Sequence, residues 1–195
     1  MRQSLISRFQ ALHRAYRQRT EATLTVETVL VLPLLVTAIT MTYSYFAAFE
    51  QKAIANKAAY TISDYLSRQT VPINADFIDG LEEIYRFLNN VPDARLRVTS
   101  VRRSQDWNKN EYYKLIWSYA SNGGTVLTQD TLASVEDRLP TLALGEEFVI
   151  VEVSRDWQPI FKVGLGTVTF GDFVVTKPRF APKVVFEYSD GRLSS

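Results

Sequence analysis

The strongest hydrophobic pattern in the chain is an uncharged run of 22 residues, Thr28–Phe49, which follows the acidic Glu27. As a helix this run rises about 33 Å, enough to cross a hydrocarbon core of about 30 Å. We therefore predict a transmembrane helix over residues 23–49. Pro33 lies inside it and is expected to kink the helix, because proline removes one backbone donor. Glu27 stands out because an ionised carboxylate beside such a run is costly.

Beyond the run, apolar positions recur with helical spacing on one side only. Ile54, Ala58 and Ile62 share a face, and charged residues occupy the other faces. Residues 50–70 are therefore predicted to prolong the same helix as an amphipathic segment. Its apolar stripe needs a cover, and residues 71–195 are long enough to supply one as a small domain with its own core.

Residues 71–195 change from helical to strand periodicity. A second helix is predicted to begin at Asn74 or Asp76 and to reach Leu88. Alternation and β-compatible residues then predict strands at 95–100, 112–119, 147–155, 167–176 and 183–188. A short helix is predicted over 129–139. The predicted fold is α+β, with a long N-terminal transmembrane and amphipathic helix packed on an antiparallel β-sheet and one or two short inserted helices.

Charge divides the chain just before the apolar run. Residues 1–22 carry a net charge of +4, and residues 23–195 carry −3. A basic flank orients a membrane span with its positive side in the cytoplasm, so we predict a cytoplasmic N-terminus and an exported body. Residues 1–22 are either a basic helix on the membrane surface or a solvated leader. The chain has no cysteine, which excludes disulfides and thiolate metal sites.

Two stretches add a more specific signal: Thr25–Leu35 reads TVETVLVLPLL, and Val149–Phe161 reads VIVEVSRDWQPIF. The first resembles the VEFALVLPLLL segment of TadE/TadG-like minor pilins, or pseudopilins, of the tight-adherence (Tad or Flp) type IV pilus system. The second is similar to the C-terminal part of such proteins. The resemblance makes Glu27 the fifth mature residue, so that a prepilin peptidase would cleave between Ala22 and Thr23. The family usually has Gly where this chain has Ala22.

The resemblance implies a non-enzymatic, single-pass protein of the inner (cytoplasmic) membrane, with a periplasmic C-terminal domain and a role in pilus assembly. The implied partners are the lipid bilayer, prepilin peptidase, other pilins and pilus assembly proteins. Cleavage would free the α-amine of Thr23, which could pair with Glu27 of a neighbouring subunit. On charge alone, the alternative is that the Glu27 carboxylate simply reaches the lipid headgroups.

Chemistry for other functions is sparse. The single histidine, His13, lies in the leader, so neither a Ser-His site nor a histidine metal cluster is expected in the exported part. We predict no catalytic residue, no metal and no cofactor. The exported body is net acidic, so we expect no nucleic acid partner and interpret a nearby group of basic residues as an exposed strand face. That basic group lies close to Trp107 and consists of Arg95, Arg97, Arg102 and Arg103.

A second function is kept as an alternative, namely an uncleaved, single-pass membrane-anchored periplasmic binding or sensor domain. Both functions place residues 71–195 outside the cytoplasm. They differ at the mature N-terminus, which is Thr23 in a processed pilin and residue 1 in an uncleaved anchor.

Overall fold

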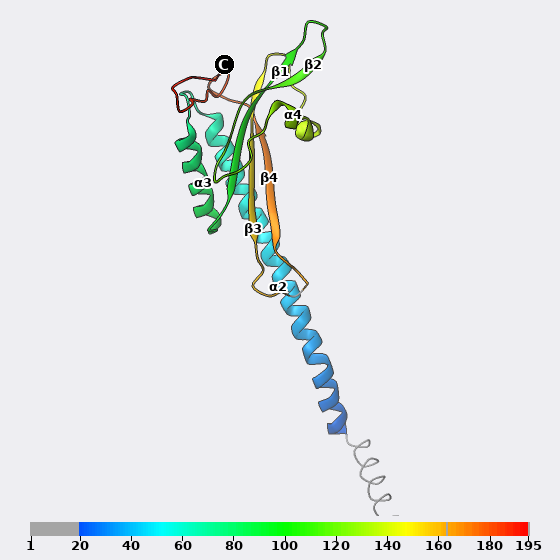
Figure 1. Ribbon diagram of the computed structural model, residues 1–195. Coiled ribbons are helices and arrows are strands. Elements are labelled where there is room, and N and C mark those ends of the chain that lie inside the picture. Colours follow the sequence, from blue (N-terminus) through cyan, green and yellow to red (C-terminus); the bar gives the residue numbers. More distant parts are fainter. Residues whose placement is uncertain (1–19, 163, 195) are drawn as a thin grey trace, which may run out of the picture. The chain divides into compact units, whose positions relative to one another are not determined.

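The computed structural model describes residues 20–162 and 164–194, with side chains from residue 25 onward. The predicted basic leader, residues 1–22, therefore lies almost entirely outside the described residues. The fold is α+β, with a long N-terminal apolar helix, a four-stranded antiparallel sheet and short additional helices, which confirms the predicted fold class at this level. In chain order (Figure 1), the elements are α2 (Thr20–Ser67), α3 (Ala75–Asn89), β1 (Arg95–Gln105), β2 (Glu111–Ala120), α4 (Gln129–Leu132), the 3-10 helix η1 (Ala133–Arg138), β3 (Glu147–Trp157) and β4 (Val168–Thr176).

The chain divides into two compact units, and each is described by itself. The helical unit comprises the residues up to Ala47 together with Pro159–Leu165. The sheet unit comprises Ala48–Gln158 and Gly166–Ser195. Helix α2 contributes its first part to the helical unit and its last part to the sheet unit.

In the helical unit, α2 contains Pro33 without ending there, and the predicted kink stays a prediction. Hydroxyl side chains that follow the proline are bonded within the helix. Each donates to the backbone carbonyl one turn earlier, at distances of 2.7 to 2.9 Å, and the donors are Thr37, Thr40, Thr42 and Ser44. Because these hydroxyl groups are hydrogen-bonded within their own helix, they remain paired when the helix is surrounded by an apolar environment.

The sheet unit is built on strands in the order β2-β1-β3-β4, each antiparallel to its neighbours. The register places Val98 of β1 opposite Val151 of β3, which lies opposite Val174 of β4. These valines share one face of the sheet, because residues directly opposite each other on neighbouring strands point to the same face. The last part of α2 and helix α3 cover this face, which we call the helix-covered face (Figure 1).

The main core lies between these helices and the sheet. Alanines of α2 leave room for close packing, and larger side chains from every layer fill the rest. The fully buried members of this core include Ala55, Ala59, Ile62 and Leu66 of α2, Ile78 and Tyr85 of α3, Leu96 and Val98 of β1, and Trp117 of β2. The amphipathic segment predicted over residues 50–70 is thus covered by the domain that follows it, as its apolar stripe requires.

Helix α2 runs alongside β4 in the same direction. Lys52 bonds to Asp172 near the start of the shared stretch, and Ser63 bonds to Thr176 near its end. Along the helix axis, Lys52 and Ser63 are about 16 Å apart. Along β4, Asp172 and Thr176 are about 13 Å apart. The two separations are similar, so these bonds hold α2 and β4 together at both ends of the shared stretch.

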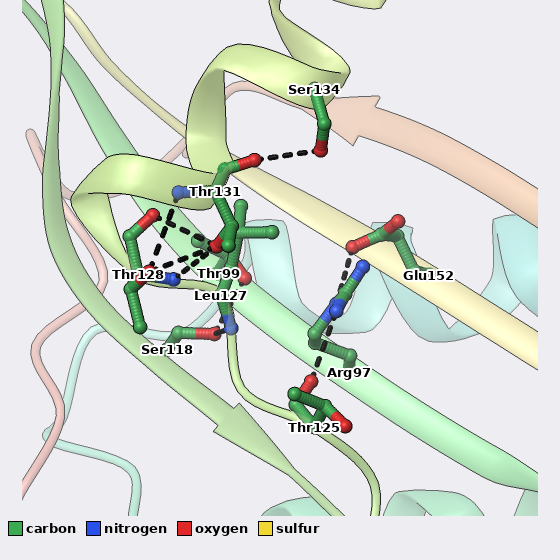
Figure 2. A network of polar contacts seen from close by, with 9 residues as sticks. All are labelled: Arg97, Thr99, Ser118, Thr125, Leu127, Thr128, Thr131, Ser134 and Glu152. Atoms are coloured by element: carbon green, nitrogen blue, oxygen red, sulfur yellow. Dashed lines mark hydrogen bonds and ion pairs between the residues drawn. The ribbon is translucent and has the colours of Figure 1, made fainter.

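The opposite face of the sheet is covered in part by the segment 121–146, which contains α4 and η1. The Leu127 backbone N–H donates to the Ser118 hydroxyl at 3.0 Å, and that hydroxyl bonds to Thr99 at 2.8 Å (Figure 2). The segment also contributes to a second apolar cluster, which consists of Val101, Leu127, Leu132, Val135, Phe148 and Ile150. Polar and apolar contacts together hold the segment on this face.

The helix predicted over 129–139 is shorter and tighter than expected. One turn of α-helix, α4, is capped by Thr128, and the chain then continues as the 3-10 helix η1. The buried residues of this segment are Leu132 and Val135, three positions apart. A 3-10 helix has three residues per turn, so it places both side chains on the sheet.

The strand predicted over 183–188 is replaced by isolated bridges. Phe186 bridges to Ile73, and Glu187 bridges to Leu193. Phe186 is buried and stacks on Trp117, with ring centroids 5.0 Å apart. Ring packing against the core therefore fixes this segment, rather than pairing with the sheet.

Leu66 of α2 is fully buried in the main core, so truncation to alanine removes its contacts with the sheet. Leu66→Ala is expected to lower the free energy of unfolding by about 2–5 kcal/mol. Tyr60→Ala on the same helix, where the side chain is 64% exposed, should change it by less than about 0.5 kcal/mol. Urea denaturation of the full-length chain in detergent, followed by tryptophan fluorescence, compares the two. Equal effects would mean that α2 does not pack on the sheet.

Candidate functional site

Helix α2 contains the residues predicted for processing and assembly, Ala22, Thr23 and Glu27, and also the predicted kink residue Pro33. The bond between Ala22 and Thr23 lies within the helix, and Glu27 follows about one turn later. Glu27 is exposed and borders a shallow depression of about 320 Å³ with an otherwise uncharged lining. The apolar residues that line this depression are Val31, Leu32 and Leu35. Pro33 lies about two turns beyond Glu27 in the same helix.

Most large apolar side chains in the first part of α2 are uncovered. Val29, Leu30 and Leu34 are 66%, 65% and 71% exposed. Burying a side chain of this size is worth about 1.5–3 kcal/mol, so a surface with many of them requires lipid or another apolar partner. In the described ranges, α2 is the single helix that is long and apolar enough to cross a membrane. It is therefore compatible with one membrane span near the N-terminus.

In the sheet unit, a polar cluster formed by Gln51, Lys52, Arg155 and Asp172 joins α2 to β3 and β4. The Lys52 ammonium donates to Asp172 Oδ1 at 2.6 Å and to the Gly171 carbonyl at 2.8 Å. Arg155 Nη2 donates to the backbone carbonyl of Gln51 at 2.8 Å. The Asp172 side chain is 5% exposed, whereas that of Lys52 is 35% exposed. The carboxylate therefore depends on its partner more than the ammonium does.

Tyr85 of α3 completes the surroundings of this cluster. Burial raises the pKa of Tyr85 to about 12, and the nearby Arg155 guanidinium opposes that rise. Within the described part, four buried polar atoms of these three residues have no hydrogen-bond partner, namely Arg155 Nε and Nη1, Asp172 Oδ2 and the Tyr85 hydroxyl oxygen. Each such atom costs about 1–3 kcal/mol when buried. We interpret the cluster as a positioning device, which fixes where α2 lies along the sheet at some cost in stability.

A groove lies at the end of the sheet where β1 begins. It consists of two adjoining cavities of about 470 and 380 Å³, which share Arg95 and Ser154 in their linings. The larger cavity is also lined by Asp93, Asp156 and Trp157. Clefts of about 300–1,000 Å³ are typical of ligand sites. This groove, with its aromatic, acidic and basic groups, is the candidate binding site of the sheet unit.

The four arginines that lie near Trp107 in the sequence do not form one site in the structure. Three of them face carboxylates: Arg97 bonds to Glu152 at 2.6 Å, Arg102 to Glu147 at 2.8 Å, and Arg103 to Glu111. The fourth, Arg95, lies in the groove and has no ion pair within the described residues. The three paired arginine side chains are 18–30% exposed, so the four arginines do not form the single exposed strand face that the sequence predicts.

The described ranges hold no group of three or more His, Cys, Asp or Glu residues that could bind a metal ion. No family model, no curated protein and no solved structure matches this chain. The functional argument therefore depends on the residues and contacts given above.

Sequence reasoning missed the polar cluster and the groove. Asp172 carries a weak signal, since it occupies an inward position of β4 two residues before the buried Val174. An acid at such a position needs a buried partner, but its partner Lys52 lies on a helix far away in the sequence. The groove leaves no local signal, because its lining comes from the loop before β1, the end of β3 and the start of β4.

The difference in burial between Asp172 and Lys52 predicts unequal effects of removing either charge. Lys52→Met leaves a buried carboxylate unpaired and is expected to lower the free energy of unfolding by about 3 kcal/mol. Asp172→Asn leaves an ammonium that can reach water, and should cost about 1 kcal/mol. Arg68→Met, which breaks the exposed pair with Asp64, should cost less than about 0.5 kcal/mol. Chemical denaturation measures all three, and equal losses for the two cluster variants would contradict the positioning role.

Proposed function

We propose that this chain is a membrane-anchored TadE/TadG-like minor pilin, or pseudopilin, which takes part in assembly of tight-adherence (Flp) pili and is not an enzyme. The observation that carries the proposal is the division of α2 into two kinds of surface. Its first part is apolar and uncovered, with Glu27 near the start, and its last part is packed on the sheet. A filament subunit needs both an apolar segment that can pass from lipid to other subunits and a folded body.

The proposal assigns a compartment to each segment. The basic leader lies in the cytoplasm, the apolar part of α2 spans the inner membrane, and the sheet unit lies in the periplasm. A prepilin peptidase would cleave between Ala22 and Thr23. Other pilins and pilus assembly proteins would then contact the uncovered apolar surface within the bilayer. The hydroxyl groups that bond to their own helix support this, because such a surface packs through close contact rather than through exchanged hydrogen bonds.

Glu27 has a defined part in the proposed assembly. In lipid, a carboxylate is costly alone and much less costly when it is paired. The α-amine of Thr23 on a neighbouring subunit is a cation of suitable reach and charge. Pairing of the two would fix the axial register between adjacent helices, because any other register leaves the Glu27 carboxylate without its cation.

The alternative function is an uncleaved, membrane-anchored periplasmic binding or sensor domain. The groove favours it, because a concave site with an aromatic ring and charged groups is what a ligand-binding domain requires. In that case α2 serves only as an anchor, and Glu27 has no partner subunit.

Replacing Glu27 by glutamine tests the assembly role. Glu27→Gln is expected to leave membrane insertion and the fold of the sheet unit intact, and to reduce the number of pili per cell about tenfold, as for a lost interaction of about 1.4 kcal/mol. Pili are counted by electron microscopy, and the protein is quantified in membrane fractions. Glu50→Gln removes the charge of another exposed glutamate of α2 and serves as the matched control. Normal piliation with Glu27→Gln would contradict the pairing.

The mature N-terminus separates the two functions. Mass spectrometry of the protein from membranes is expected to find Thr23 as the first residue. Ala22→Gly, which restores the residue usual in the family, should leave cleavage intact, and Ala22→Leu should block it, because a large side chain obstructs the peptidase at the cut. An intact residue 1 in the unmodified protein would favour the uncleaved anchor.

A further inference from the structure

Trp107 is the most exposed large hydrophobic side chain in the part of the chain that the structure describes, with 91% of its surface accessible. It lies in the loop between β1 and β2, and this hairpin projects beyond the other strands (Figure 1). Tryptophan carries a large apolar area and is enriched at the centres of protein interfaces. An indole ring this exposed is therefore a candidate contact residue for a protein partner.

The loop that carries Trp107 is held in shape by its own hydrogen bonds. The Asp106 N–H donates to the Asn110 carbonyl at 2.9 Å, and the Asn110 N–H donates to Asp106 Oδ1 at 2.8 Å. The Lys109 N–H donates to the Asp106 carbonyl at 3.1 Å, with Lys109 in the left-handed conformation at φ 65°. A preorganised loop loses little conformational entropy on binding, so the indole is presented ready for contact.

The loop and the groove lie at opposite ends of the same sheet unit. Arg95, in the groove, is the first residue of β1, and Gln105, next to the loop, is the last. A strand of this length spans about 33 Å. Trp107 therefore cannot reach the groove of its own chain, but the groove of a second copy is open to it.

The groove matches the exposed groups of the loop. Its Arg95 guanidinium has no ion pair within the described ranges and can stack on an indole face. Trp157 also lines the larger cavity of the groove, while its ring packs on Phe170 with the ring centroids 5.9 Å apart. The Asp156 carboxylate of the groove is exposed and opposite in charge to Lys109, which is also exposed. The volume of about 470 Å³ lies in the range that holds whole ligands, so one indole ring fits.

We propose that sheet units associate head to tail, with Trp107 and Lys109 of one copy bound in the groove of the next. The two contacting surfaces differ, so each added copy still offers a free loop and a free groove. Such a contact extends into a row of subunits instead of closing as a symmetric dimer. The inference goes beyond the proposed function, because it concerns the folded body and requires neither cleavage at Thr23 nor the charge of Glu27.

The absence of native cysteine makes a direct test simple. Asn108→Cys places a thiol beside Trp107, and Gln158→Cys places one in the groove lining. The full-length variants in detergent micelles are treated with a bis-maleimide that is shorter than the separation of the two sites within one chain. The double variant is expected to give a ladder of dimers, trimers and larger products. A mixture of the two single variants should give dimers that contain one copy of each.

Trp107→Ala in the double-cysteine background is expected to reduce the cross-linked fraction about tenfold, as for a lost contact of about 1.4 kcal/mol. Tyr112→Ala, on the same hairpin with 43% of the side chain exposed, is the matched control and should leave the ladder unchanged. Circular dichroism checks that each variant is folded. A Glu27→Gln variant should still form the ladder, which separates this contact from the assembly role of Glu27.

Three results would overturn the proposal. The first is a double variant that stays monomeric over the whole range of protein concentration. The second is a ladder that Trp107→Ala leaves unchanged. The third is a dimer formed by Asn108→Cys alone at the yield of the mixture, which would mean that two hairpin tips meet each other.

Discussion

An α-helix bonds its backbone polar groups internally, so its side chains alone decide which surroundings it can occupy. Helix α2 depends on this property in both units. Its first part presents apolar side chains on all sides, together with hydroxyl groups that bond to its own carbonyls. Its last part supplies Ala55, Ile62 and Leu66 to the main core. The sheet unit cannot complete that core without the last part of α2.

The two faces of the sheet are covered by different elements and to different extents. The helix-covered face is closed by α2 and α3 and contains the polar cluster, where Lys52 and Asp172 match one position of the helix to one position of β4. The other face is closed only where segment 121–146 lies on it, and the groove opens at the end where β1 begins. The sheet unit therefore leaves part of one face open to solvent without losing its core.

The parts of the fold that follow from local periodicity could be predicted from the sequence. The apolar run, the amphipathic extension of α2 and the alternation of Leu96 and Val98 all show which side of an element is buried. The strand order could not be predicted, because β1 pairs with β3 across a long stretch of chain. The pairing of Asp172 with Lys52 could not be predicted for the same reason, because the two residues are far apart in the sequence. The groove could not be predicted either, because its lining comes from separate segments. Phe186 reads as a strand residue, but it serves the core through its ring.

The parallel course of α2 and β4 also has a mechanical consequence. The bonds of Gln51, Lys52 and Ser63 to the sheet, and that of the Ser67 carbonyl to the Arg179 N–H at 2.8 Å, are spread along the helix. A force applied at residue 48 along the helix axis therefore loads these bonds together, in shear, and does not peel them apart one after another. The body is thus built to withstand tension that enters through its own N-terminal helix.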